Sequence, residues 1–474
     1  MSESLIQQQV EIQGLATAIL LPSASVYGDP IERRPGVAGP LTSVVGIGLF
    51  QRAVLTLQRA GIRQLIVLAG PEEDQLKQAL GRGPRVTIPV RWMPIREFPL
   101  DDPHTWDVLA ADVHGFCLIA SARGVFSRPL IERLRRDVQG EQAILVVQPV
   151  RRHGAGEQRV ALTVRAERLL ALGPARGEES GLVAGELLVV PASLMRSRSA
   201  PDSAEETIPI RRWIERAARD GRVRVLRTDQ HPSEWYQDVW TQDDVPRAER
   251  RLFSSLKGEF EGFVDRYFNR KLSRWFTRVF LVLGLSPNAI TMIATVIGLQ
   301  AAAEFGVGTY SAGILAAALF QLAAVIDCCD GEVARLTFTE SPFGAWLDIA
   351  MDNVVHMAIF AGIAVGAYQR AAGQDEAWIP LALGAAAIVG NALSFLLVNR
   401  AQKIKAASGW KTPVHAAWSD FMLKNVASRD FSVIVLLFAI LGKLEWFLWM
   451  AATGSIVFAV LMLWVIRPSA TSRA

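Results

Sequence analysis

Four carboxylates within apolar stretches constrain this chain more than any other feature of its sequence. Asp327 and Asp330 lie three residues apart, and Asp348 and Asp352 lie four residues apart in the next apolar stretch. On helices these spacings place each pair on one face, one turn apart. An ionised carboxylate in an apolar helix is costly, so these residues predict a functional site. Two facing acidic pairs indicate a site for Mg²⁺ or Mn²⁺, hard cations that prefer oxygen ligands.

Small residues and one arginine accompany the acids. Gly331, Ala334 and Gly344 leave space between the two expected helices, and Arg335 is suited to gripping a phosphate. The alternative is that the acids are loop residues, or membrane-embedded carboxylates neutralised by nearby basic side chains. Their shared helical spacing with small residues favours a site.

The same residues match the pattern D-x-x-D-G-x-x-A-R, eight residues, then G-x-x-x-D-x-x-x-D at every fixed position. The chain therefore resembles the CDP-alcohol phosphotransferases (CDP-alcohol phosphatidyltransferases). The resemblance implies an enzyme that moves a phospho-alcohol or phosphatidyl group from a CDP-alcohol to an acceptor hydroxyl, releasing CMP, in phospholipid or inositol-phosphodiester synthesis. It also implies a homodimer and a two-metal site. The implied metal ligands are Asp327, Asp330, Asp348 and Asp352, with Asp352 as catalytic base and Gly331, Ala334, Arg335 and Gly344 as substrate-binding residues.

The distribution of apolar residues predicts an all-α transmembrane bundle at residues 286–474. The chain is 51% hydrophobic with mean hydropathy +0.24, and the apolar excess lies after about Gly284. Six spans are expected, the fifth of them short for a full span. Their ranges are Ala289–Phe305, Tyr310–Ile326, Ala345–Ala367, Ile379–Leu397, Phe431–Leu441 and Trp446–Ile466.

The distribution of basic residues predicts the orientation of the bundle. The connection between the fourth and fifth segments is rich in lysine and arginine, whereas the short turns on the other side carry only Arg370 and Lys443. By the positive-inside rule, both termini and the acidic site should face the cytoplasm, as in an inner-membrane protein. Trp378, Trp446 and Trp464 near segment ends are expected to be interfacial anchors.

Residues 250–285 are expected to form an amphipathic juxtamembrane helix. Between Leu256 and Leu283, aromatic residues are interleaved with lysine and arginine, which suits the headgroup layer of a bilayer. A plain connector whose aromatic residues pack on the bundle is an equal alternative. The following Ser286-Pro287-Asn288 begins a helix by ordinary capping rules.

Residues 1–249 are expected to form a cytoplasmic α/β domain of Rossmann type. Apolar strands alternate with helical stretches, which predicts a parallel sheet, and no signal peptide precedes them. The expected strands are Thr17–Leu21, Leu65–Leu68, Phe116–Ile119 and Ala143–Val147, with helices near Gly48–Ala60, Glu72–Leu80 and Pro129–Val138. The three cysteines suggest neither a disulfide framework nor a zinc site.

This domain resembles a sugar-nucleotide nucleotidyltransferase. The resemblance rests on Gly39-Pro40-Leu41 and on Trp235–Thr241, and the two halves together are similar to inositol-1-phosphate cytidylyltransferase/di-myo-inositol-phosphate-phosphate synthase fusions. The glycine-rich loop is replaced by Pro22–Pro30, the expected lysine is Gly39, and the expected aspartate is missing from Ala120–Arg123. A degenerate domain with a scaffold or regulatory role is therefore expected.

Two other classes of function remain open from the sequence. A membrane transporter should show two similar halves, which are not seen, and a non-catalytic anchor would not need Gly344 or Asp352. The expected partners are a CDP-alcohol, an alcohol or phospho-alcohol acceptor and the lipid bilayer, with no nucleic acid. The sequence does not identify the two alcohols.

Overall fold

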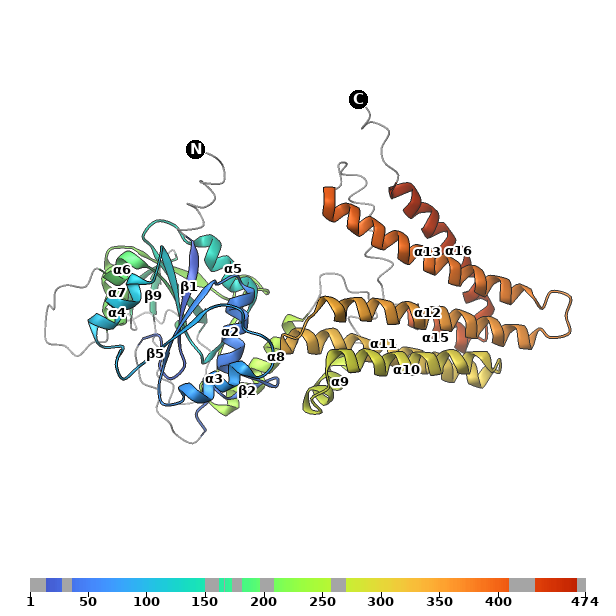
Figure 1. Ribbon diagram of the computed structural model, residues 1–474, viewed down its shortest axis with the longest axis horizontal. Coiled ribbons are helices and arrows are strands. Elements are labelled where there is room, and N and C mark those ends of the chain that lie inside the picture. The colour runs from blue at the N-terminus through green and yellow to red at the C-terminus, as the bar shows by residue number, and fades with distance from the viewer. Residues whose placement is uncertain are drawn as a thin grey trace, which may run out of the picture. The chain divides into compact units, whose positions relative to one another are not determined.

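The computed structural model describes residues 14–27, 36–149, 162–165, 167–172, 181–196, 209–256, 270–408 and 431–466. The chain divides into two compact units, Met1–Ser255 and Leu256–Ala474. Figure 1 labels their helices and strands. Of the juxtamembrane segment predicted at 250–285, residues 257–269 lie outside the described part of the chain.

Within its described residues, the N-terminal unit is built on a nine-stranded sheet with the order β5-β4-β1-β6-β11-β8-β12-β10-β9. Its strands are β1 (Leu15–Leu21), β4 (Gln64–Ala69), β5 (Val90–Pro94), β6 (Phe116–Ser121), β8 (Ala143–Pro149), β9 (Leu162–Arg165), β10 (Arg168–Leu172), β11 (Leu182–Pro191) and β12 (Val223–Arg227). Two short ribbons pair β2 (Ser43–Val44) with β3 (Ile47–Gly48), and β7 (Gly124–Phe126) with β13 (Tyr236–Asp238).

The prediction of a parallel sheet is only partly correct. Strands β4, β1 and β6 are parallel neighbours, as are β8 and β12. However, β11 lies between β6 and β8 and is antiparallel to both, so the sheet is mixed. Strand β11 is buried along its whole length and lacks the polar alternation of a half-exposed strand, so its direction could not be read from its sequence.

Helices cover both faces of the sheet because successive residues of each strand point to opposite sides. In β1, Ile19 belongs to the same buried cluster as Trp106 of α4, while Leu20 belongs to the other cluster, with Phe50 of α2. Ser127 caps α5 through its hydroxyl, with a proline in the first turn. The helices are α2 (Leu49–Arg59), α3 (Glu73–Gly81), α4 (Pro103–Ala111), α5 (Arg128–Asp137), α6 (Ala192–Arg196), α7 (Pro209–Arg219), η1 (Gln242–Asp244) and α8 (Val245–Ser255).

The C-terminal unit is helical. Ser286, Thr309 and Ser341 cap three of its helices, each hydroxyl accepting a hydrogen bond from a backbone N–H three residues later. The cap before the first span is therefore Ser286. The helices are α9 (Arg270–Val282), α10 (Pro287–Gly306), α11 (Tyr310–Thr337), α12 (Pro342–Arg370), α13 (Ile379–Ser408), α15 (Phe431–Ile440) and α16 (Leu444–Ile466).

The predicted count of six spans is not reached among the described residues. Among the described residues, five helices are long and apolar enough to cross a membrane: α10, α11, α12, α13 and α16. Helix α15 has ten residues and so rises only about 15 Å, half of the roughly 30 Å apolar thickness of a bilayer. The basic connection before α15 lies mostly at 409–430, outside the described part of the chain.

Glycines bring α10 and α12 into close contact. A Cβ added at Gly362 would lie 2.1 Å from the carbonyl oxygen of Ala302, and one at Gly366 would lie 2.1 Å from that of Phe305. Neither distance leaves room for a methyl group, so these two positions require glycine. Such small-residue contacts are how helices approach closely where lipid surrounds them. This contact helps to fix the position of α12, which carries Asp348 and Asp352.

Candidate active site

Three of the four predicted carboxylates lie together. Asp327 and Asp330 come from α11 and Asp348 from α12, and one carboxylate oxygen of each lies within 4.8 Å of the others. Asp327 and Asp330 are 8% and 5% exposed, and Asp348 is half-buried. Three oxygen donors at this separation, in a shielded position, are suited to a hard divalent cation.

Residues of α10, and the glycines and arginine of the motif, lie around this cluster. Thr291 of α10 donates a hydrogen bond to Asp330 Oδ2. The guanidinium of Arg335 lies over Gly331, where a Cβ would meet Arg335 Nη1 at 3.3 Å. A Cβ at Gly344 would meet Asn288 Oδ1 at 3.2 Å, so α10 and α12 also approach each other beside the cluster. Ala334 is half-buried on α11.

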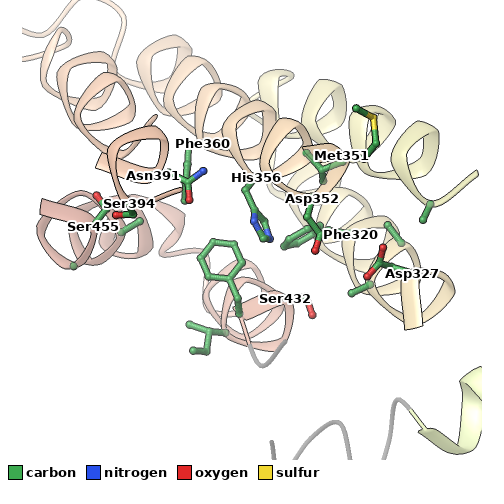
Figure 2. A pocket seen from close by; sticks show the side chains of 18 of the residues that line it. Phe320, Asp327, Met351, Asp352, His356, Phe360, Asn391, Ser394, Ser432 and Ser455 are labelled. Atoms are coloured by element: carbon green, nitrogen blue, oxygen red, sulfur yellow. The ribbon is translucent and has the colours of Figure 1, made fainter. Parts of the chain in front are cut away.

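Asp352 faces a cavity next to the cluster. The cavity has a volume of about 540 Å³ and is lined by Asp327, Asp352 and residues of α10, α11, α12, α13, α15 and α16. Figure 2 shows Asp352 and His356 directed into it, with Asp327 at one end. An acceptor hydroxyl held in this space can therefore meet a carboxylate that lies one helical turn from the cluster residue Asp348.

Polar residues on the far wall of the cavity were missed by the sequence reasoning. Asn391 lines it and donates a hydrogen bond of 3.2 Å to Asn353 of α12. Hydroxyl groups from three helices line the same space, those of Ser394, Ser432 and Ser455. In the sequence these residues are single polar positions within apolar runs. They indicate a function only when the structure shows that they line one cavity.

His356 has a clear packing role. Its ring makes edge contacts with Phe320 and Phe431, at centroid distances of 6.0 and 5.1 Å. It also lines the cavity, so its imidazole is held by aromatic residues beside Asp352. Arg429 and Asp430, which directly precede α15, lie outside the described residues.

A buried glutamate joins the site to α9. Glu332 follows Gly331 in the motif and is 5% exposed. Its carboxylate accepts hydrogen bonds from Ser273 Oγ at 3.2 Å and Thr277 Oγ1 at 2.7 Å, both on α9. Cys329 Sγ also donates to the backbone carbonyl of Ser273. The turn of α11 that carries Asp330 and Gly331 is thus fastened to the helix that precedes the first span.

In the N-terminal unit, Ser25, Val26 and Tyr27 of the loop after β1 are hydrogen-bonded to residues of β11. Ser25 Oγ and the Val26 backbone N–H donate to the carboxylate of Glu186, at 2.8 and 2.6 Å. The hydroxyl of Tyr27 donates to the carbonyl of Gly185 at 2.9 Å. Burial raises the pKa of Glu186 to about 7. In an active nucleotidyltransferase, this loop would offer its backbone N–H groups to a phosphate. Here the Val26 N–H donates to the carboxyl group of Glu186 instead.

The CDP-alcohol phosphatidyltransferase family matches residues 284–467. A bifunctional IPC transferase and DIPP synthase of Rubrobacter xylanophilus is 29% identical over 76% of this chain and 79% of its own length. An archaetidylinositol phosphate synthase of Pyrococcus horikoshii is 38% identical over 19% of this chain and 45% of its own length.

Solved nucleotidyltransferases are structural neighbours of the N-terminal unit. One is the inositol-1-phosphate CTP transferase from T. maritima, at 14% identity and a TM-score of 0.39, covering 52% of this chain and 99% of that one. In the C-terminal unit, the carboxylate cluster lies within the residues that the family model matches. That unit belongs to the CDP-alcohol phosphatidyltransferase family, and the chain is a CDP-alcohol phosphotransferase.

Proposed function

We propose that the chain transfers a phospho-alcohol from a CDP-alcohol in a reaction that depends on divalent metal ions at the carboxylate cluster. The observation that carries this proposal is the convergence of Asp327, Asp330 and Asp348 within 4.8 Å on two helices of the family match. Asp352 is proposed as a further ligand at the edge of the cluster. Bound Mg²⁺ or Mn²⁺, in a two-metal site, would supply Lewis-acid neutralisation of the pyrophosphate and of the departing CMP.

The protein residues have separate roles in this proposal. Asp352 accepts the proton of the acceptor hydroxyl as its oxygen attacks the β-phosphorus of the donor. The bond between that phosphorus and the bridging oxygen breaks, and the oxygen leaves with CMP. Gly331, Ala334 and Gly344 leave room for the donor, and Arg335 binds its phosphate. His356 and its aromatic neighbours shape the acceptor side of the cavity.

We assign the reaction to the synthesis of inositol-containing phospholipids or phosphodiesters. Support comes from relatives named archaetidylinositol phosphate synthase and IPC transferase and DIPP synthase. The lining of the cavity also supports a polyol, because Asn391 and the serine hydroxyls offer both donors and acceptors.

The setting of the enzyme is part of the same proposal. Five long apolar helices support an integral membrane protein, and the basic connection after α13 supports an active site and termini on the cytoplasmic side of the inner membrane. A homodimer is supported by the family resemblance. The N-terminal unit is proposed to act as a scaffold or regulator, because its loop is bonded to Glu186.

Release of CMP by the purified protein tests the proposal. CDP-inositol and CDP-diacylglycerol would be offered as donors, each with inositol phosphate, glycerol phosphate or serine as acceptor. The expected result is metal-dependent release with one donor and acceptor pair, lost in Asp330→Asn, which removes a charged ligand at nearly constant shape. Wild-type turnover by Asp330→Asn would contradict the assignment of the carboxylate cluster as the metal site. A transporter or an anchor would release no CMP from any pair.

A further inference from the structure

Helix α9 is too short to cross a membrane, and it is held against two helices that are long enough. Its 13 residues rise about 20 Å, less than the roughly 30 Å apolar thickness of a bilayer. Glu332 of α11 accepts hydrogen bonds from Ser273 and Thr277 of α9. Phe280 of α9 also shares a buried cluster with residues in the first turns of α10 and the second half of α11, namely Ile290, Ala294, Ile326, Cys329 and Val333. Helix α9 therefore lies beside the ends of two candidate spans, at the level of a bilayer surface (Figure 1).

An apolar stripe of α9 lies away from this packed face. It consists of Leu272, Trp275, Val279 and Val282. Their spacings of three, four and three residues keep them on one side of the helix. Leu272, Trp275 and Val282 are 39%, 58% and 88% exposed. The ring of Trp275 makes an edge contact with the ring of Phe276, at a centroid distance of 4.9 Å. An exposed apolar stripe beside membrane spans indicates a surface that contacts lipid.

A basic stripe runs beside the apolar one. Arg274 and Arg278 are four residues apart, one helical turn, and α9 contains no acidic residue. Arg278 is exposed and Arg274 is half-buried. Guanidinium groups bind phosphate oxygens in a forked geometry. A long arginine side chain can also lie along apolar surface while its charged end stays in the headgroup layer.

We propose that α9 is a docking surface for the headgroups of anionic phospholipids. Its apolar stripe lies at the boundary of the acyl chains, and Arg274 and Arg278 contact the lipid phosphates. A helix with an apolar side and a basic side lies in the plane of the interface, where tryptophan is also enriched. The negative potential of anionic lipids attracts basic side chains there, so charge complementarity selects these lipids over zwitterionic ones. The surface goes beyond the transfer reaction, because none of its residues lines the catalytic cavity or belongs to the carboxylate cluster.

Quenching of Trp275 fluorescence by brominated lipids in nanodiscs tests this surface. The difference between the parent and Trp275→Phe isolates Trp275 from the other tryptophans of the chain. At equal mole fractions in a phosphatidylcholine bilayer, brominated phosphatidylglycerol should quench Trp275 more strongly than brominated phosphatidylcholine. A basic side chain at the surface should raise the local preference for anionic lipid about fivefold. The double change Arg274→Gln and Arg278→Gln should therefore bring the two lipids to nearly equal quenching.

Two further variants serve as controls for this experiment. Arg274→Lys combined with Arg278→Lys keeps both charges and should keep most of the preference, which separates lost attraction from lost folding. Lys443→Gln, at an exposed position in the turn before α16, should leave the preference unchanged. Equal quenching by the two lipids in the parent overturns the proposal. Absence of quenching by either lipid also overturns it, because protein, such as a second copy of the chain, would then cover Trp275. Neither readout involves CMP release, so this proposal and the proposed transfer reaction fail separately.

Discussion

Replacing Glu332 by alanine should loosen α9 from α11 and slow the transfer reaction. The carboxylate accepts hydrogen bonds from Ser273 and Thr277, and all three side chains are buried. The change removes the acceptor, so the hydroxyl groups of Ser273 and Thr277 need other hydrogen-bond acceptors. Because Gly331 and Asp330 directly precede Glu332, a shift of this turn moves the carboxylate cluster.

The size of the effect follows from the two bonds. Hydrogen bonds to a charged group contribute about 1.5–3 kcal/mol each. Serine and threonine in helices can turn back to the carbonyl four residues earlier, which recovers part of that loss. A net destabilisation of about 3 kcal/mol is expected, which corresponds to a fall in Tm of roughly 6–12 °C for a unit of this size. Glu332→Gln retains one acceptor oxygen and should lie between alanine and the parent.

Thermal unfolding and CMP release on the same preparations would measure both consequences. Glu304→Ala is the matched control, because its carboxylate on α10 accepts an exposed hydrogen bond of 3.0 Å from Gln300. That variant should stay within about 0.5 kcal/mol of the parent. Thr277→Val combined with Glu332→Gln should cost less than the sum of the single changes, because both remove the same bond. A Glu332→Ala protein with the Tm and rate of the parent would refute the reasoning.

Four further outcomes are expected. Asp352→Asn should bind CDP with Mg²⁺ within about tenfold of the parent while transfer falls by about 10²–10⁴, and calorimetry showing CDP binding lost would make Asp352 primarily a metal ligand. Burial raises the pKa of Glu186 from 4.5 to about 7, so the folded N-terminal unit holds this proton more tightly than the unfolded chain does. The resulting stability, about 3 kcal/mol, is fully present below pH 4.5 and is lost as pH rises through 7; thermal melts at pH 5 and 8 should show it, and Glu186→Gln should remove the difference. The Asp330→Asn protein should release no pyrophosphate from CTP with any phospho-alcohol, and release would mean that the N-terminal unit is an active nucleotidyltransferase. A cysteine at Ser408 should be labelled only from the cytoplasmic side of intact cells, and labelling from outside would reverse the topology.

Much of the catalytic unit could be predicted because its signals are local. Asp327 and Asp330 belong to one helix, and the 3.6-residue repeat alone places them on one face. The apolar runs likewise predicted α10, α11, α12, α13 and α16, whose ends extend further at several termini. Helix α15 (Phe431–Ile440) also agrees closely with the predicted segment Phe431–Leu441, which was expected to be short for a full span.

In the N-terminal unit, the strands could be predicted and their arrangement could not. Runs of apolar residues predicted β1, β4, β6 and β8 because burial on both faces demands them. The insertion of β11 between β6 and β8 depends on pairing between segments far apart in the chain. Such pairing leaves no periodic signal in either strand.

The sequence by itself predicted a carboxylate site on helices, because the residue types and their helical spacing indicate which groups share a face. Only the tertiary structure decided which faces meet. It brought Asp348 to Asp327 and Asp330, and gave Glu332 its partners on α9. Each of these contacts joins elements that are separate in the chain. Their approach is set by packing, such as the glycine contact between α10 and α12, and packing depends on all the elements at once.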